Sequence, residues 1–211
     1  MARQAGRHGC KAGGVMRLFD WPFGAMEAQS FDLIMADPPW TFEIRSDKGD
    51  AKSAQAQYAC MDLAVIKALP VLDLAAPDCV LWLWATNPML PLAFDVLAAW
   101  GFTYKTAGCW GKTTPFGKLA FGTGYILRSA NEPFLIGTRG APKTSRSVRS
   151  LIMAARREHS RKPDEAFSAA EQLIPDARRL ELFSRTDRPG WSTWGNEVGK
   201  FGTVAATEVA L

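Results

Sequence analysis

Apolar residues occur in short blocks that alternate with segments of helical spacing. Residues 31–36 form an apolar run of strand length, and residues 79–85 (CVLWLWA) are apolar on both faces. Strands of the second kind are typical of parallel sheets that are buried on both sides. Between these runs, residues 61–74 carry apolar side chains at helical spacing, and Pro70 must end or kink the helix. The first half of the chain therefore predicts a strand, a helix and a second strand.

The alternation continues through the second half of the chain. A helix over 90–100 is closed by Gly101, a strand follows over 102–110, and 111–124 is a long loop of the kind that is usually functional or mobile. The remaining predicted elements are a hairpin around 126–137, a strand over 151–155, a helix over 164–174 and a strand over 179–184. This order predicts an α/β fold, with helices on both faces of a mostly parallel sheet and the hairpin as an antiparallel pair at one edge.

Composition narrows the class of protein without giving a function. With 211 residues, 47% hydrophobic and 22% charged, the chain fits one globular domain with a sizeable core. We expect a basic, disordered arm over 1–15, a single domain over 16–201 and a frayed tail over 202–211. The arm lacks the apolar segment of a signal peptide, and no apolar run approaches the roughly 20 residues of a membrane span. We therefore expect a cytoplasmic protein that does not contact a membrane.

Charge, cysteines and tryptophans add three constraints. The net charge of +4 suits a polyanion that is bound transiently. The four cysteines form no C-x-x-C pair and have no partner histidine in a zinc pattern, which disfavours both a metal site and a disulfide framework. The tryptophans in strand-like segments are expected in the core: Trp82, Trp84 and Trp110. Those beside turns are candidates for contact with a planar ligand: Trp40, Trp191 and Trp194.

The strand at 31–36 runs directly into the tetrapeptide Asp37-Pro38-Pro39-Trp40. Because proline lacks an N–H and fixes φ, the chain must leave the strand at Asp37 in a rigid, extended turn. The turn places a carboxylate, two carbonyls and an indole at the carboxyl edge of a sheet, where α/β proteins bind ligands. Asp37 and the Pro38 carbonyl can accept the two N–H bonds of an exocyclic aromatic amine while Trp40 stacks on its ring. By itself, the tetrapeptide is equally compatible with an ordinary turn whose tryptophan packs in the core.

This tetrapeptide is one of five motifs that occur together, in a fixed order, in one protein family. The other four are Tyr58–Met61 with Leu69–Val71, Leu81–Trp84 followed by Thr86, His159–Glu165, and Glu181–Arg185 with Gly190–Glu197. Over about residues 19–199 the chain thus resembles the MT-A70 family of S-adenosylmethionine-dependent adenine-N6 methyltransferases, in their short bacterial and phage form. The resemblance implies a Rossmann-like methyltransferase fold with a permuted motif order, in which the catalytic motif precedes much of the cofactor site. The chain has no G-x-G-x-x-G after a strand, which argues against a nicotinamide enzyme.

The resemblance also implies S-adenosylmethionine as the cofactor and indicates its binding residues. They are Asp20, Asp37, His159, Lys162, Arg185, Asn196 and Glu197. Lys162 matches a lysine that can pair with the cofactor carboxylate, although a lysine here could equally be a solvated residue at a helix start. Asn196 and Glu197 fall at the ribose-binding pair, and Arg185 would contact the ribose or the methionine end. Asp20 lies near the position of an acidic residue that faces the cofactor adenine.

Catalysis is assigned to Asp37, Pro38, Pro39 and Trp40. In direct in-line transfer, Asp37 orients the amine of the base and stabilises the positive charge that develops on its nitrogen. A general base is not required, because the proton can leave after the nitrogen has become positive. A metal is not required either, because a sulfonium is already an excellent leaving group.

The implied partner is a nucleic acid, from which the target adenine must be flipped out or presented on a single strand. Besides Trp40, cations in three loops are expected to rim the pocket: Lys48, Lys52, Lys112, Lys118, Arg139, Lys143, Arg146 and Arg149. Each alone would be an ordinary surface charge, but their concentration in three loops indicates a phosphate track. We find no zinc fingers, no long helical arm and no room for an RNA-targeting domain, which favours the short type of enzyme and DNA over RNA as the substrate.

Three alternatives stay open from the sequence. The first is an RNA adenine-N6 methyltransferase. The second is a non-catalytic nucleic-acid-binding subunit, which the intact Asp37–Trp40, Lys162 and Asn196 argue against. The third is methylation of a glutamine amide in a protein, as performed by related enzymes with Asn-Pro-Pro-Tyr in place of Asp-Pro-Pro-Trp.

Overall fold

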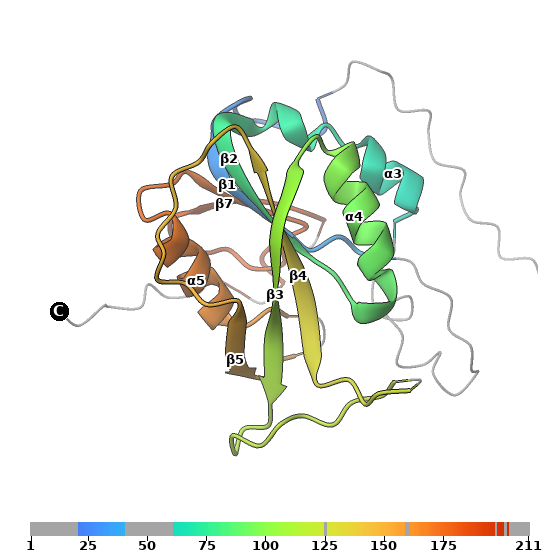
Figure 1. The fold of residues 1–211 in the computed structure, drawn as a ribbon. Helices are drawn as coiled ribbons and strands as arrows, with labels where there is room; N and C mark the ends of the chain where they lie inside the picture. Colours follow the sequence, from blue (N-terminus) through green and yellow to red (C-terminus); the bar gives the residue numbers. More distant parts are fainter. Residues whose placement is uncertain are drawn as a thin grey trace, which may run out of the picture.

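A seven-stranded sheet forms the centre of the computed structural model, which describes residues 21–40, 61–124, 126–158, 161–196, 198–200 and 202 (Figure 1). Its strand order is β5-β3-β4-β2-β1-β6-β7. The strands are β1 (Phe31–Ala36), β2 (Ala75–Trp84), β3 (Thr103–Thr113), β4 (Asn131–Arg139), β5 (Leu151–Ala155), β6 (Arg179–Leu182) and β7 (Trp191–Trp194). Strand β4 runs antiparallel to its neighbours β2 and β3, and all other neighbouring pairs are parallel. The sheet is therefore mixed.

Three α-helices accompany this sheet in the described residues: α3 (Leu63–Ala68), α4 (Leu90–Ala99) and α5 (Asp164–Leu173). The side chain of Asp62 caps α3 by accepting a hydrogen bond from the Ala64 N–H. As the sequence predicted, Pro70 separates α3 from the short 3-10 helix η1 (Val71–Asp73); a second one, η2 (Asn87–Met89), leads into α4. Gly101 follows α4 with a φ of 75°, a conformation that favours glycine at this position.

The alternation of side chains along each strand sends them into two cores on opposite faces of the sheet. Ile34, Leu81 and Leu83 point into the core beneath α3 and α4. Their neighbours Met35 and Trp82 point into the second core, beneath α5. Figure 1 shows α3 and α4 on one side of the sheet and α5 on the other. The predicted α/β class with helices on both faces is confirmed.

Aromatic rings dominate the core beneath α5. Trp82 and Trp84 lie fully buried on β2, and Trp110 lies buried on β3, as predicted. The ring of Phe134 on β4 stacks on Trp82 with a centroid distance of 4.1 Å and meets Trp84 edge-on at 5.2 Å. This aromatic packing extends to Trp84, the last residue of β2, at the carboxyl end of the strand.

The predicted edge hairpin is wrong. Strand β4 (Asn131–Arg139) lies inside the sheet between β2 and β3, and residues 126 and 127 form no strand and are exposed. The reason lies in the burial of β4, which packs Phe134 into one core and Leu135 into the other, as an interior strand does. Strand β7 was not predicted either; its four residues pair with β6 at the sheet edge. The predicted arm at 1–15 and nearly all of the predicted tail lie outside the described residues.

Candidate active site

The carboxyl end of β1 presents Asp37 on the α5 side of the sheet. Leu33 and Met35 point into the core beneath α5, and two residues further on Asp37 continues the same side of the strand. The two prolines then turn the chain inward: the Trp40 N–H donates to the Pro38 carbonyl at 2.8 Å. The turn leaves the Asp37 carboxylate at the sheet edge with 24% of its side chain exposed.

A chain of four charged groups crosses the carboxyl edge of the sheet. The Lys162 ammonium, just before α5, donates to Asp37 Oδ2 at 2.6 Å and lies 2.7 Å from Glu132 Oε1. The other oxygen of Glu132 lies 2.7 Å from the Lys112 ammonium at the end of β3. Only 6% of the Lys162 side chain is exposed, so this lysine is shared by two carboxylates and shielded from water. We refer to Asp37, Lys162, Glu132 and Lys112 as the ion chain.

The strand pattern explains why these groups meet. Because β4 is antiparallel, its first residues lie at the same edge as the last residues of β1, β2 and β3. Glu132 precedes Phe134 by two residues and Lys112 follows Trp110 by two, so both continue the aromatic face beneath α5. Lys162 Nζ lies 5.4 Å from the ring centroid of Trp84, and Lys112 Nζ lies 4.7 Å from that of Trp110. Aromatic faces thus support both ammonium groups.

Burial and ion pairing shift the pKa values of the ion chain in opposite directions. Burial raises the pKa of Asp37, and the neighbouring charge of Glu132 raises it further, while Lys162 and Arg185 oppose the shift. Burial would also raise the pKa of Glu132, but Lys162 and Lys112 outweigh it and lower the pKa. For Lys162, burial is outweighed by Asp37 and Glu132, and its pKa rises. Lys162 is therefore firmly protonated. Of the two carboxyl groups in the ion chain, Asp37 is the one that accepts a proton more readily.

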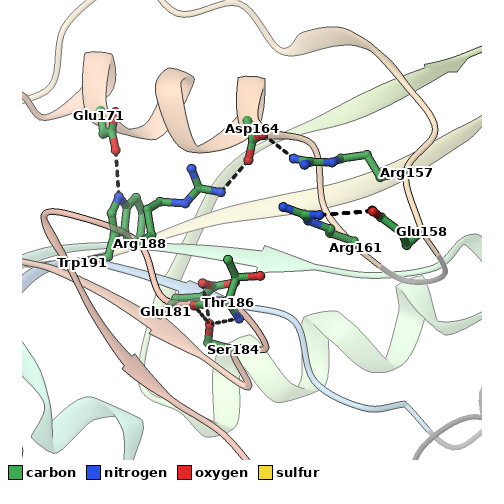
Figure 2. Close-up of polar contacts among 10 residues, drawn as sticks. All are labelled: Arg157, Glu158, Arg161, Asp164, Glu171, Glu181, Ser184, Thr186, Arg188 and Trp191. Atoms are coloured by element: carbon green, nitrogen blue, oxygen red, sulfur yellow. Dashed lines mark hydrogen bonds and ion pairs between the residues drawn. The ribbon is translucent and has the colours of Figure 1, made fainter. Parts of the chain in front are cut away.

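A small pocket opens beside Asp37 at the end of β6. Its lining residues are Asp37, Arg161, Lys162, Phe167, Glu181, Phe183, Arg185, Thr186 and Arg188. Phe183 adopts a φ of 63°, which is rare for a bulky residue and occurs where the chain leaves β6 to border the pocket. Burial raises the pKa of Glu181 to about 7, although the Ser184 hydroxyl donates to this carboxylate at 2.7 Å (Figure 2). The pocket thus combines aromatic walls, cations and an acid that titrates near neutral pH.

Asp164 clamps one wall of the pocket. Its carboxylate pairs with the guanidinium groups of Arg157 and Arg188, the latter at 2.6 Å (Figure 2). Arg188 in turn lies over the ring of Phe167, 3.8 Å from its centroid. Burial would raise the pKa of Asp164, but hydrogen bonds and charge from the two arginines lower it. Asp164 also opens α5, where a negative charge complements the helix dipole.

The turn after β7 returns the chain to this pocket. The Ser184 N–H donates to the Trp194 carbonyl at 2.9 Å, and the next residue, Gly195, lies against the backbone of Ser184. A Cβ at Gly195 would come within 2.5 Å of the Ser184 carbonyl oxygen, so only glycine permits this approach. The exposed Asn196 is thereby held beside the residues that end β6.

This geometry agrees with the comparison to known families. The model of the MT-A70 family matches residues 31–197, most of the chain. The chain belongs to the MT-A70 family. Its 29% identity to the Type II methyltransferase M.MunI of a Mycoplasma species extends over 85% of this chain and 82% of that protein. It is 30% identical to the human N(6)-adenine-specific methyltransferase METTL4 over 82% of this chain, and 30% identical to the N6-methyladenosine RNA methyltransferase MTA1 of Cryphonectria parasitica over 84%. The chain spans only 38% and 54%, respectively, of these two relatives.

Two motifs of this MT-A70 chain that lie 125 residues apart in sequence meet at the Lys162–Asp37 contact. The sequence did not predict this contact, since it assigned Lys162 to the cofactor carboxylate. Glu132, which completes the pairing of Lys162, was missed altogether. Its only signal was an acidic residue directly before an apolar strand, and recognising it would have required the knowledge that β4 is antiparallel.

The structure places Trp40 differently from the prediction. Its side chain is 4% exposed and belongs to the core beneath α3, because the tight Pro38–Trp40 turn and a bridge to Met61 draw it inward. An exposed ring ready to stack on a base is therefore not what the structure shows. Among the described residues, its indole Nε1 has no hydrogen-bond partner. Trp191, another predicted ligand contact, is likewise a core residue and donates to Glu171 at 2.8 Å (Figure 2).

The predicted phosphate track divides between the two edges of the sheet. Lys118 is exposed on the loop after β3, at the edge that carries the site, whereas Lys112 is held in the ion chain. Arg139 ends β4 at the opposite edge and donates to the carbonyls of Leu72 and Ala75. Lys143 and Arg146 follow it, in a segment where the Ser145 N–H donates to Leu173 at the far end of α5, and Arg149 precedes β5. Because β4 runs antiparallel, the prediction that Arg139, Lys143 and Arg146 rim the pocket is wrong.

Five predicted site residues lie outside the described residues: Asp20, Lys48, Lys52, His159 and Glu197. In the part of the chain that the structure describes, no helix has the length and apolar character needed to cross a membrane. The same residues contain no cluster of three or more histidine, cysteine or acidic side chains that could hold a metal ion.

Proposed function

We propose that the chain transfers a methyl group from S-adenosylmethionine to the N6 amine of adenine in DNA. The observation that carries this proposal is the 2.6 Å contact between Asp37 of Asp-Pro-Pro-Trp and Lys162 at the carboxyl edge of the sheet. Two motifs that the resemblance assigned to the target amine and to the cofactor are joined there beside one pocket. A carboxylate oriented by a buried ammonium is suited to hold an amine that becomes positive during transfer.

The pocket suits the charges of S-adenosylmethionine. Arg185 and Arg161 offer positive charge to its carboxylate, Glu181 offers negative charge to its ammonium, and Phe167 and Phe183 offer apolar walls to its rings. Arg188 Nε is buried with no partner among the described residues, which leaves a donor at the pocket wall. The cofactor supplies a methyl group on a positively charged sulfur, which leaves readily. Asn196 and Glu197 complete the proposal as ribose contacts, as the resemblance to the MT-A70 family implies.

The chain's own residues then act on the amine. Lys162 engages one oxygen of Asp37, and the other oxygen can accept an N–H bond from the amine of adenine. The Pro38 carbonyl accepts the Trp40 N–H and retains a second lone pair for the other N–H bond. As the nitrogen becomes positive, Asp37 stabilises it, and the raised pKa of Asp37 favours acceptance of the surplus proton.

DNA is proposed over RNA because the chain matches a short relative nearly end to end, 82% of M.MunI, and resembles the short members of the family. RNA is the second candidate, because the fungal relative MTA1, which is 30% identical to this chain, is named an RNA methyltransferase. The polymer therefore needs a direct test.

The test is mass spectrometry of nucleosides from a host without adenine-N6 methylation, with DNA and RNA digested separately. Wild type should produce N6-methyldeoxyadenosine in DNA, and Asp37→Ala should lower the mark by about 100-fold or more. Asp95→Ala, which removes an exposed carboxylate paired with Lys67, is the matched control and should leave the mark unchanged. The mark in RNA alone would overturn DNA as the substrate. Absence of both marks with intact cofactor binding would favour a non-catalytic subunit or an amide methyltransferase.

A further inference from the structure

The connection between β3 and β4 is a folded projection at the edge that carries the site. It spans residues 114–130, of which residue 125 lies outside the described part, and we call it the apolar loop. Its backbone is internally bonded: Thr114 donates to Lys118 at 2.7 Å, and Gly122 donates to Ser129 at 2.8 Å. Figure 1 shows the loop extending beyond the ends of β3 and β4. The loop thus has a definite shape although little of the protein covers it.

This ordered loop exposes large apolar side chains, which is unusual for a soluble surface. The exposed residues are Phe116, Leu119, Phe121, Ile126 and Leu127. Phe116 is 91% exposed and Ile126 is 95% exposed, so neither contributes to a core. Phe116 sits in a tight turn beside Gly117, whose φ of 76° fixes the turn. Side chains held outward in this way are positioned to contact something other than this chain.

Charge around the loop indicates what it contacts. The loop and the strand ends at its root, residues 111–134, contain the cations Lys112, Lys118 and Arg128 but a single acidic residue, Glu132. Glu132 is already paired with Lys112 and Lys162, so its charge is neutralised within the ion chain. On the loop itself, Lys118 is exposed and the Arg128 guanidinium lies 5.3 Å from the ring centroid of Phe121. Apolar tips flanked by cations, with no carboxylate on the loop, complement a polyanion with stacked rings.

The same charges disfavour a symmetric dimer through this loop. A two-fold contact would bring the loop of one protomer against the same loop of its partner. Lys118 and Arg128 would then face their own copies, and the loop offers no acidic side chain to neutralise them. A nucleic acid brings phosphates to the cations and base faces to the apolar side chains.

We propose that the apolar loop is a wedge that enters a DNA duplex beside the target adenine and fills the space in the base stack when that adenine is flipped out. This rests on the proposed function. The root of the loop is close to the site, because the Lys112 carbonyl accepts the Ala120 N–H while the Lys112 side chain belongs to the ion chain that ends at Asp37. Apolar side chains that insert between base steps compensate for lost stacking in other duplex-bending proteins.

The experiment compares wild type with Phe116→Ser/Ile126→Ser on three DNA substrates of one sequence. They are a fully paired duplex, a duplex whose target adenine faces an abasic site, and the single strand. We expect the variant to lose about tenfold in kcat/KM on the paired duplex and less than twofold on the single strand. Tyr104→Ser removes a side chain that is 43% exposed near the opposite end of β3, and it should leave the duplex-to-single-strand ratio unchanged.

Binding provides a readout that does not depend on methylation. By fluorescence anisotropy, wild type should bind the abasic duplex more tightly than the single strand, and the variant should lose this preference. If wild type shows the preference but methylates no substrate, the proposed function fails and the wedge stands. Equal losses on paired duplex and single strand would overturn the wedge. So would a wild type that sediments as a dimer while the variant is a monomer, since the loop would then be a protein interface.

Discussion

The two faces of the sheet are built from the same alternating strands, yet they bury different groups. The core beneath α3 and α4 is mostly aliphatic, and its aromatic members are Phe23, Phe31, Trp40, Trp100 and Phe102. Beneath α5 the strands bury aromatic rings, which give way at the carboxyl edge to the ion chain and the pocket. In the described residues, the buried polar or charged side chains are Lys162, Ser184 and Thr186, and all three belong to the ion chain or border the pocket.

This difference shows that the fold keeps one face of the sheet for apolar packing and places its buried charges on the other. A face packed with hydrocarbon stabilises through area and is indifferent to pH. A face that ends in paired charges is stable only while every charge keeps its partner, because an unpaired buried charge is costly. Substitutions on the two faces should therefore differ in pH dependence even where their costs are similar.

Removal of Lys162 should have the largest effect on stability. Lys162→Met leaves Asp37 without its partner and Glu132 with only Lys112, and breaking a buried ion pair costs about 3–5 kcal/mol. In the wild type, the lowered pKa of Glu132 contributes stability above about pH 4.5 that is lost as the pH falls. In the variant, the unpaired Asp37 carboxylate destabilises the fold less as it becomes protonated at lower pH. The deficit measured by urea unfolding should thus be large at pH 8 and smaller at pH 5.

A second variant controls for this interpretation. Lys162→Met/Glu132→Gln removes one of the two carboxylates left behind and should recover part of the lost free energy of unfolding at pH 8. A deficit that is the same at pH 5 and pH 8, and that Glu132→Gln does not relieve, would mean that Lys162 stabilises by packing alone. The contrast between the two faces would then be wrong.

Trp40→Ala tests the apolar face. Because the indole is 4% exposed in the core beneath α3, its loss should cost about 3 kcal/mol of unfolding free energy. The cost should be the same at pH 5 and pH 8, in contrast to Lys162→Met. If instead Trp40→Ala unfolds at the wild-type urea midpoint and only raises KM for nucleic acid, the indole leaves the core to stack on a base.

The sequence was most informative where the pattern and a motif agreed. The apolar run at 31–36 and the Asp37-Pro38-Pro39 sequence after it predicted β1 and where it ends, and Pro70 and Gly101 correctly ended their helices. These signals are local, because a proline or a glycine acts on its own segment whatever the rest of the chain does.

The position of β4 inside the sheet depends on distant parts of the chain, and it was mispredicted as part of a hairpin at the edge. Its apolar run can pair on either side and in either direction, and only the interior position beside β2 makes it antiparallel. Because β4 is antiparallel in this position, Glu132 lies beside Lys162 at one edge of the sheet, and Lys143 lies at the opposite edge. The missed acid and the misplaced cations therefore have one cause, the topology of the sheet, which a single sequence does not specify.

Glu181 provides a second test of pH-dependent stability on the face beneath α5. Burial raises its pKa from 4.5 to about 7, so the folded state holds an extra proton and stability falls as the pH rises between these values. Glu181→Gln keeps the hydrogen bond from Ser184 but cannot ionise. We expect the variant to match the wild type near pH 4 and to exceed it by about 2 kcal/mol at pH 8, after allowance for partial solvent contact. Equal pH profiles in urea unfolding would contradict the raised pKa.

The smallest expected effect extends the comparison from the two faces to the two edges of the sheet. Lys118 projects from the edge that carries the site, whereas Lys143 follows β4 at the opposite edge, and both side chains are exposed. A lysine that contacts one phosphate of duplex DNA contributes about 0.9 to the slope of log affinity against log salt. Lys118→Gln should therefore reduce that slope by about 0.9, and Lys143→Gln should leave it unchanged, with no change in urea midpoint for either. A reduced slope for Lys143→Gln would show that DNA also follows the basic segment after β4, and that the bound duplex reaches both edges of the sheet.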